Sequence, residues 1–221
     1  MTETQQPHGG SVKHRPLFRG HIHRHSATAA VPLFAWLIII AGSWTERLAV
    51  IIYAVGVTTM LAVSAVYHSG SLSSRVEAIL KRIDHSTILL AIAGSYTAIT
   101  ALALSGTAEV FLLIYIWIAT AIGVGVRLFW INSPYVINAL IYLAAGWSAL
   151  LVVPAFISSL DSTNTVLIFL GGGVYTMGAI VYALHKPNPW PEHFGYHEIF
   201  HLLVTIAASL HFILVARLIL S

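Results

Sequence analysis

The segment His197–Leu220 reads HEIFHLLVTIAASLHFILVARLIL. Its apolar part, Ile199–Leu220, is long enough to cross the ~30 Å hydrocarbon core of a membrane at about 1.5 Å per helical residue. Two histidines one helical turn apart, His197 and His201, open the segment on one helix face, which is a common half-site for a metal. Ionisable groups at membrane depth are costly and usually functional. A complete site then requires a third ligand at the same depth.

The composition is that of an integral membrane protein. The 221 residues are 57% hydrophobic and 9% charged, whereas a soluble domain carries roughly 25% charged residues. The net charge of +3 is too small to favour nucleic acid as a partner. Cysteine is absent and histidine occurs 12 times. Disulfides are therefore excluded, and a metal must be bound by His, Asp or Glu.

Seven apolar stretches follow one another along the chain, each close to the ~20 residues that a spanning helix needs. They are Ala27–Gly42, Leu48–Tyr67, Ile83–Leu104, Val110–Trp130, Tyr135–Ile157, Val166–Leu184 and Ile199–Leu220. The first is the shortest. We therefore predict an all-α membrane protein, with a seven-transmembrane-helix bundle over residues 27–221.

A polar N-terminal segment, residues 1–26, precedes the bundle. It contains five histidines, namely His8, His14, His21, His23 and His25. We interpret it as a solvated cytoplasmic tail, and a histidine-rich arm that captures metal is the alternative. The segment does not resemble a secretory signal.

Basic residues predict the orientation, because they gather on the cytoplasmic side of membrane proteins. With a cytoplasmic N-terminus, the inner segments carry Lys13, Arg15, Arg19, Arg24, Arg75, Lys81, Arg82, Arg127 and Lys186. The outer side carries Arg47 and Arg217. We therefore expect a multi-pass membrane protein with a cytoplasmic N-terminus and the C-terminus outside.

This topology brings three distant parts of the chain to one membrane depth. His68 lies at the cytoplasmic end of the second stretch, and Asp84 at the cytoplasmic start of the third. The cytoplasmic start of the last stretch holds His197 and His201. Ser64 lies one turn from His68 on the same helix face.

These residue types suit a catalytic metal site. Three neutral imidazoles, those of His68, His197 and His201, bind zinc and leave a fourth position for water. A nearby carboxylate, Asp84, can act as a general base, and the hydroxyl of Ser64 can bind a ligand, a water or a developing oxyanion. We predict zinc ligation by the three histidines and catalytic roles for Asp84 and Ser64.

Structural alternatives exist for each residue. A single intramembrane histidine can be a hydrogen-bonded packing residue, and Asp84 can pair with Lys81 or Arg82 at the interface. Ser64 can bond the carbonyl four residues back.

Other histidines lie near these positions in the sequence or the predicted topology. His211 lies ten residues beyond His201, about 15 Å along the helix, and is too far to share its metal. His85 points about 100° away from Asp84. His185 and His193 are substitutes on the same side.

Three motifs resemble those of the progestin and adiponectin receptor family. They are Ser64-Ala65-Val66-Tyr67-His68, Asp84-His85-Ser86 and His197-Glu198-Ile199-Phe200-His201. The surrounding sequence is most similar to the bacterial branch, which is named for haemolysin III and includes membrane homeostasis proteins. Ala98 stands where that branch would have proline. The chain also lacks the large soluble domain of the animal receptors, which weakens a ligand-receptor role.

The resemblance implies a cytoplasmic-side zinc held by His68, His197 and His201, with Asp84 on its water and Ser64 in the site. The wider superfamily includes alkaline ceramidases. We therefore expect a zinc-dependent lipid amide or ester hydrolase that acts on membrane lipids in lipid homeostasis. The alternatives are a non-catalytic membrane sensor or regulator with a structural zinc, and a haemolysin or pore-forming activity.

Overall fold

The computed structural model describes residues 18–70, 72–130 and 133–221, and every regular element within these ranges is helical. The helices are α1 (His21–Ile40), α2 (Trp44–His68), α3 (Ser74–Ala103), α4 (Gly106–Phe129), α5 (Tyr135–Gly146), η1 (Ser148–Val152), α6 (Val153–Ser159), α7 (Ser162–Leu184) and α8 (Tyr196–Leu220). The predicted all-α class is confirmed.

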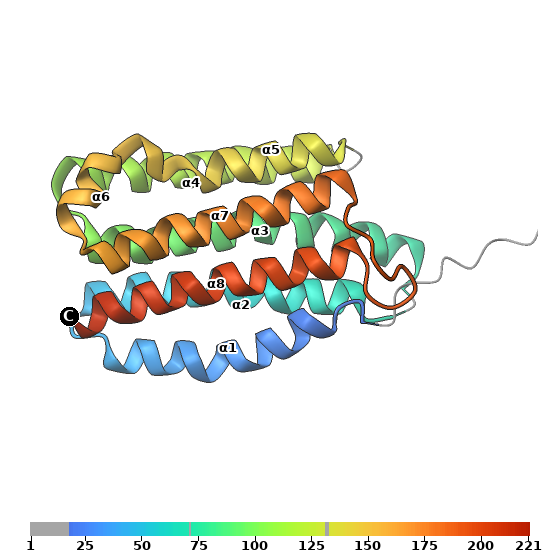
Figure 1. Ribbon diagram of the computed structural model, residues 1–221, viewed down its shortest axis with the longest axis horizontal. Helices are drawn as coiled ribbons and strands as arrows, with labels where there is room; N and C mark the ends of the chain where they lie inside the picture. The colour runs from blue at the N-terminus through green and yellow to red at the C-terminus, as the bar shows by residue number, and fades with distance from the viewer. Residues whose placement is uncertain (1–17, 71, 131–132) are drawn as a thin grey trace, which may run out of the picture.

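The helices form an elongated bundle that closes on itself (Figure 1). Chain neighbours pack together from α1 to α5, α5 packs on α7, α7 on α8, and α8 returns to α1. The helix α3 also contacts α5 and α8, so it lies nearest the middle. The start of α1 and the C-terminus lie at opposite ends of the bundle (Figure 1).

Six helical segments are long and apolar enough to cross a membrane: α2, α3, α4, the composite α5–η1–α6, α7 and α8. The helix α1 is not among them, because its first turns are polar. It begins at His21, and only its part Ala27–Ile40 is predominantly apolar, which spans roughly 21 Å as a helix. The chain is a multi-pass membrane protein, and the seventh crossing and the orientation stay predictions.

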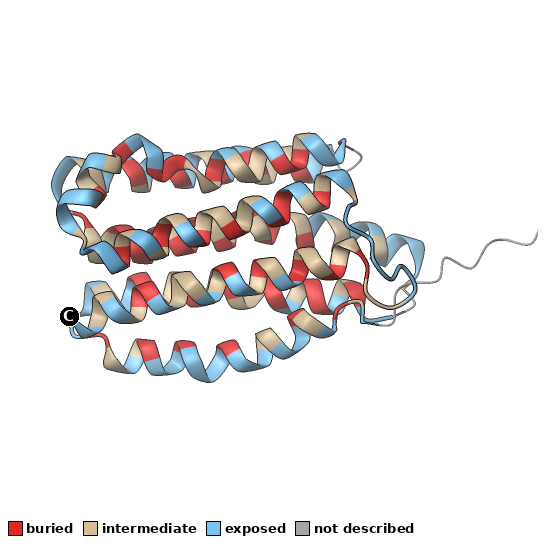
Figure 2. Cartoon of the chain, viewed as in Figure 1, coloured by how far each residue is buried: buried red, intermediate tan, exposed pale blue. Residues whose placement is uncertain are grey.

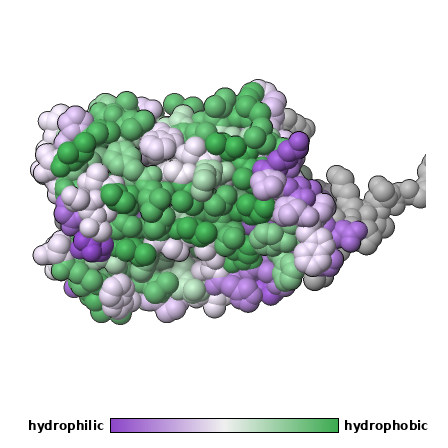
Figure 3. Space-filling model, in the orientation of Figure 1, coloured by the Kyte–Doolittle hydropathy of each residue, from purple (hydrophilic) through white to green (hydrophobic). Residues whose placement is uncertain are grey.

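The outer surface of the bundle is apolar, as a lipid environment requires. Exposed residues cover the outward faces of the helices (Figure 2), and many of them are large hydrophobic side chains such as Ile39, Phe129 and Leu140. Hydrophobic residues fill the middle of the surface, and hydrophilic ones gather toward its ends (Figure 3). A water-soluble protein would not expose a continuous patch of this size.

The helices α2 and α3 approach each other closely at two glycines. A Cβ on Gly56 would lie 2.7 Å from the Leu90 carbonyl oxygen, and one on Gly94 would lie 2.9 Å from the Ile52 carbonyl oxygen. Small residues allow such backbone contact between membrane helices. This contact fixes how far His68, at the end of α2, lies from the first turns of α3.

The predicted fifth helix, Tyr135–Ile157, is interrupted. The helix α5 ends at Gly146, and η1 and α6 continue the span, with Pro154 in the first turn of α6. The hydroxyl of Tyr96 donates to the Gly146 carbonyl (2.6 Å) and accepts from the Ala149 amide (2.9 Å). Broken helices persist at membrane depth only where such partners satisfy the freed backbone groups.

We expect replacement of either packing glycine by alanine to destabilise the bundle. The added methyl group would meet backbone atoms, which cannot swing away, and overpacking of this kind costs about 1–3 kcal/mol. Thermal unfolding of Gly56→Ala and Gly94→Ala in detergent measures the loss. Gly173→Ala is the matched control, because a Cβ there meets nothing within 4 Å. Equal stability of all three variants would contradict the close packing of α2 against α3 at these two glycines.

The predicted orientation can be tested with single thiols, because the chain has no cysteine of its own. Glu192 and Ser221 are both exposed and lie at opposite ends of the bundle. We expect a membrane-impermeant maleimide to label Ser221→Cys in spheroplasts and to label Glu192→Cys only after lysis. The reverse pattern, or labelling of both before lysis, would show the orientation to be wrong.

Candidate metal centre

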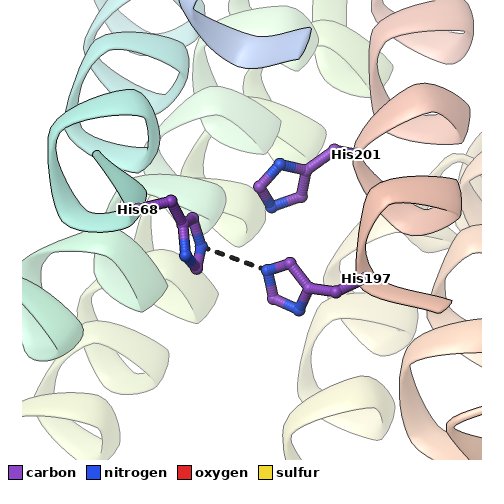
Figure 4. A group of neighbouring side chains, drawn as sticks. All are labelled: His68, His197 and His201. Carbon is purple, nitrogen blue, oxygen red and sulfur yellow. Dashed lines mark hydrogen bonds between the residues drawn. The ribbon is translucent and has the colours of Figure 1, made fainter. Parts of the chain in front are cut away.

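Three histidine side chains from two helices converge at one end of the bundle. His68 ends α2, whereas His197 and His201 occupy the first two turns of α8. Each ring offers one nitrogen to a metal, and these three nitrogens lie within 4.8 Å of one another. The rings point toward a common centre, and the Nε2 atoms of His197 and His68 are 3.1 Å apart (Figure 4).

The local sequence explains why α8 presents this pair. The carboxylate of Glu198 accepts a hydrogen bond from the Gly195 amide (2.8 Å), which caps the start of the helix. The helix therefore begins at Tyr196, and His197 and His201 fall on one face. His201 is only 2% exposed.

One pair of the cluster has the spacing of ligands in a tetrahedral metal site, and the three nitrogens lie within 4.8 Å of one another. Zinc–nitrogen bonds of 2.0–2.1 Å place two tetrahedral imidazole nitrogens about 3.3 Å apart, close to the 3.1 Å between His197 and His68. Three converging neutral imidazoles leave one coordination position open. Within the described ranges, no other group of three His, Asp or Glu residues converges in this way.

Asp84 and Ser64 lie together beside the histidines. Both are buried, with exposed fractions of 7% and 4%. The Ser64 hydroxyl lies near the Asp84 carboxyl group, and the described part of the chain has no ion pair between Asp84 and Lys81 or Arg82. Both residues line the same cavity as His197 and His201.

A partly open, mainly apolar cavity of about 130 Å³ extends from this group into the bundle. Asp84, Ser64, His197 and His201 line its polar end, and its wall continues to Ile168 in α7. A cavity of similar size can hold a benzene-sized apolar group. A longer apolar chain would have to extend outward between helices.

Arg127 forms a buried polar network next to the cavity. From the sequence we expected this residue in a cytoplasmic segment. Its guanidinium is fully buried and donates to Ser133, Asn138 and the Nδ1 atom of His85, the last at 2.7 Å. Arginine has no acceptor, so Nδ1 of His85 must accept and its proton lies on Nε2. His85 lines the cavity, so it offers an N–H donor beside Asp84.

Two N-terminal residues also reach the site, and sequence reasoning missed both. The ring of His23, in α1, stacks on the His201 ring with 3.8 Å between centroids and 4° between planes. Arg19 pairs with Glu198 at 2.5 Å. A polar stretch before an apolar helix is a weak signal for such contacts. Both residues fall in the expected tail, whose residues 1–17 lie outside the described ranges.

Three further histidines that the sequence analysis considered, His185, His193 and His211, lie within the described ranges. His185 packs between the rings of Tyr135 and Tyr196, with centroids 4.5 and 4.6 Å away, and His193 lies against Trp190. His211 lines the cavity farther along α8, and its Nε2 atom is 3.5 Å from the Ile168 carbonyl. None of these belongs to the converging group in the described structure.

Comparison with known proteins identifies the family. A family model described as "Haemolysin-III related" matches residues 11–212. The chain belongs to this family. The "Hemolysin-3 homolog" of Bacillus subtilis (strain 168) is 30% identical to the chain over 185 residues, covering 82% of this chain and 84% of the relative.

Two further relatives extend the comparison of this haemolysin-III-related protein. "Hemolysin-3" of Bacillus cereus is 28% identical over 193 residues, covering 86% of this chain and 85% of the relative. The human "Monocyte to macrophage differentiation factor" is 28% identical over 173 residues, covering 76% and 68%. No solved structure matches the chain.

We expect the purified protein to bind one divalent metal and His201→Ala to lose it. Removing a ligand should weaken binding by more than the roughly 10–100-fold typical of residues that only support ligands. Metal analysis after dialysis against a chelator measures the effect. His211→Ala is the matched control, because it removes the same side chain from the same helix. Equal metal content in both variants would contradict the assignment.

Proposed function

We propose that this haemolysin-III-related protein is a zinc-dependent hydrolase of a membrane lipid amide or ester, acting at the cytoplasmic face of the bacterial inner membrane. One observation carries the proposal. A cluster of three histidines and a buried carboxyl group share the polar end of an apolar cavity inside a membrane bundle. This combination supports chemistry on a ligand that is mostly hydrocarbon.

The histidines would hold the metal, and Asp84 would move the proton. When bound, zinc with an open position supplies Lewis acidity and lowers the pKa of water. Asp84 would accept a proton from the attacking water and later donate it to the leaving amine or alcohol. The Ser64 hydroxyl would hold the Asp84 carboxyl in place. The Nε2–H of His85 would donate to the substrate carbonyl oxygen.

The cavity supports a lipid as the substrate. Its wall beyond Asp84 is formed largely by apolar side chains, including Ile88, Ile92 and Val204. An acyl chain in contact with this wall would keep bulk water away from the reacting bond, which strengthens the electrostatic interactions there. A ceramide-like amide, with its polar group at the histidines and its chains between helices, fits these constraints.

Lysis of membranes is a second candidate, favoured only by the name hemolysin-3 of two relatives. A lytic pore would need a water-filled path, whereas the described cavity is mostly apolar. Regulation by a purely structural zinc is the third candidate. The presence of only three converging histidines weighs against it, because structural zinc sites usually have four protein ligands.

Asp84→Asn tests the hydrolase directly. We expect this variant to retain zinc and to lose lipid turnover by about 100-fold or more, the scale of a general base. The assay would place purified protein in nanodiscs with amide- and ester-linked lipids and measure released fatty acid by mass spectrometry. Asp161→Asn is the matched control, because Asp161 is exposed and pairs with Arg217 near the other end of α8.

The results separate the three candidate functions. Zinc-bound wild-type protein without turnover of any lipid, or undiminished turnover in Asp84→Asn, would overturn the hydrolase. Lysis of erythrocytes by Asp84→Asn at the wild-type level would assign lysis to a cause other than hydrolysis.

A further inference from the structure

The residues Phe18–His23, which we call the N-terminal strap, cross the end of the bundle where the three histidines meet. The Phe18 amide donates to the His193 carbonyl at 3.3 Å, which ties the strap to the α7–α8 connection. Gly20 adopts φ +82°, and a Cβ on it would lie 3.0 Å from the Cβ of His68. The strap therefore contacts both helix ends that carry the candidate ligands.

An ion pair anchors the strap at the site. Arg19 Nε lies 2.5 Å from Glu198 Oε1, and the Glu198 side chain is 1% exposed. Glu198 follows His197 directly and caps α8. The Arg19 side chain is 20% exposed, so the ion pair places the strap beside the first turn of α8 without burying it there.

His23 is the anomalous residue of the strap. It is 3% exposed and stacks face to face on His201. Neither ring nitrogen has a hydrogen-bond partner in the described structure. An unpaired buried polar group is destabilising, and the proposed hydrolysis gives His23 no part. A phenylalanine or leucine would fill the same space without this cost.

We infer that His23 is an additional metal ligand that binds the metal transiently as it enters or leaves the three-histidine site. The inference rests on the metal of the proposed function. Three imidazoles leave an open coordination position, and a fourth imidazole can occupy it when the strap shifts. Binding to His23 would offset the loss of one resident ligand during exchange. At rest, His23 is not part of the converging group.

Two variants of His23 distinguish ligation from simple cover. His23→Phe keeps a flat ring on His201 and removes both nitrogens, whereas His23→Ala removes the nitrogens and opens space. If His23 carries the metal, both variants exchange it more slowly. If the ring only covers the site, His23→Ala exchanges it faster. His25→Phe is the matched control, because His25 is exposed on the same helix.

The experiment uses the full chain in nanodiscs loaded with zinc. It measures zinc transfer to a chromogenic chelator and reloading from buffered zinc. We expect both rates to fall about tenfold in His23→Phe and His23→Ala, the lower end of effects near metal ligands, with unchanged stoichiometry and unchanged rates in His25→Phe.

Faster exchange in His23→Ala, or an unchanged rate in either His23 variant, would overturn the inference. A reduced zinc stoichiometry in both would also overturn it, because His23 would then be a permanent ligand. Wild-type protein that binds no zinc would instead contradict the proposed function.

Discussion

The backbone contact between α2 and α3 determines the relative depth of the groups in the site. Gly56 and Gly94 allow the two helices to pack with carbonyl oxygens where side chains would otherwise stand. Ser64, two turns beyond Gly56, thereby meets Asp84 of α3. His68, one turn further, then faces the start of α8. A wider helix pair would separate the carboxyl group from the histidines by the width of a side chain.

Polar side chains in the bundle follow the rule that membrane interiors impose. Hydroxyl groups of α3 bond carbonyls of their own helix, as Ser95 does with Ala91 and Thr97 with Ala93. The Tyr96 hydroxyl forms hydrogen bonds with the backbone groups that are freed where α5 ends. The concentration of charged and imidazole groups at one end is therefore a departure from the general pattern. Such departures are expected at sites where function opposes stability.

Much of this arrangement could be predicted from the sequence, because it depends on periodicity. The spacing of His197 and His201 fixes a shared helix face, and apolar length identifies most of the spans. The start of α1 could not be predicted, since His21 and His23 are polar and the stacking of His23 on His201 of α8 is a tertiary contact. Arg127 was counted as a surface charge, because partners such as Asn138 come from another helix.

The three-histidine cluster also has a consequence for which ion the proposed metal site would hold. Imidazole nitrogen binds zinc, copper, iron and nickel alike, and affinities rise along the first-row series to copper. Without a thiolate, the ligand set cannot discriminate between metal ions by their softness. It also contains no sulfur that oxidants could modify. Selection must therefore come from geometry and from the free metal concentrations of the compartment that the site faces. The occupant reflects cellular metal supply as well as the protein's own preference.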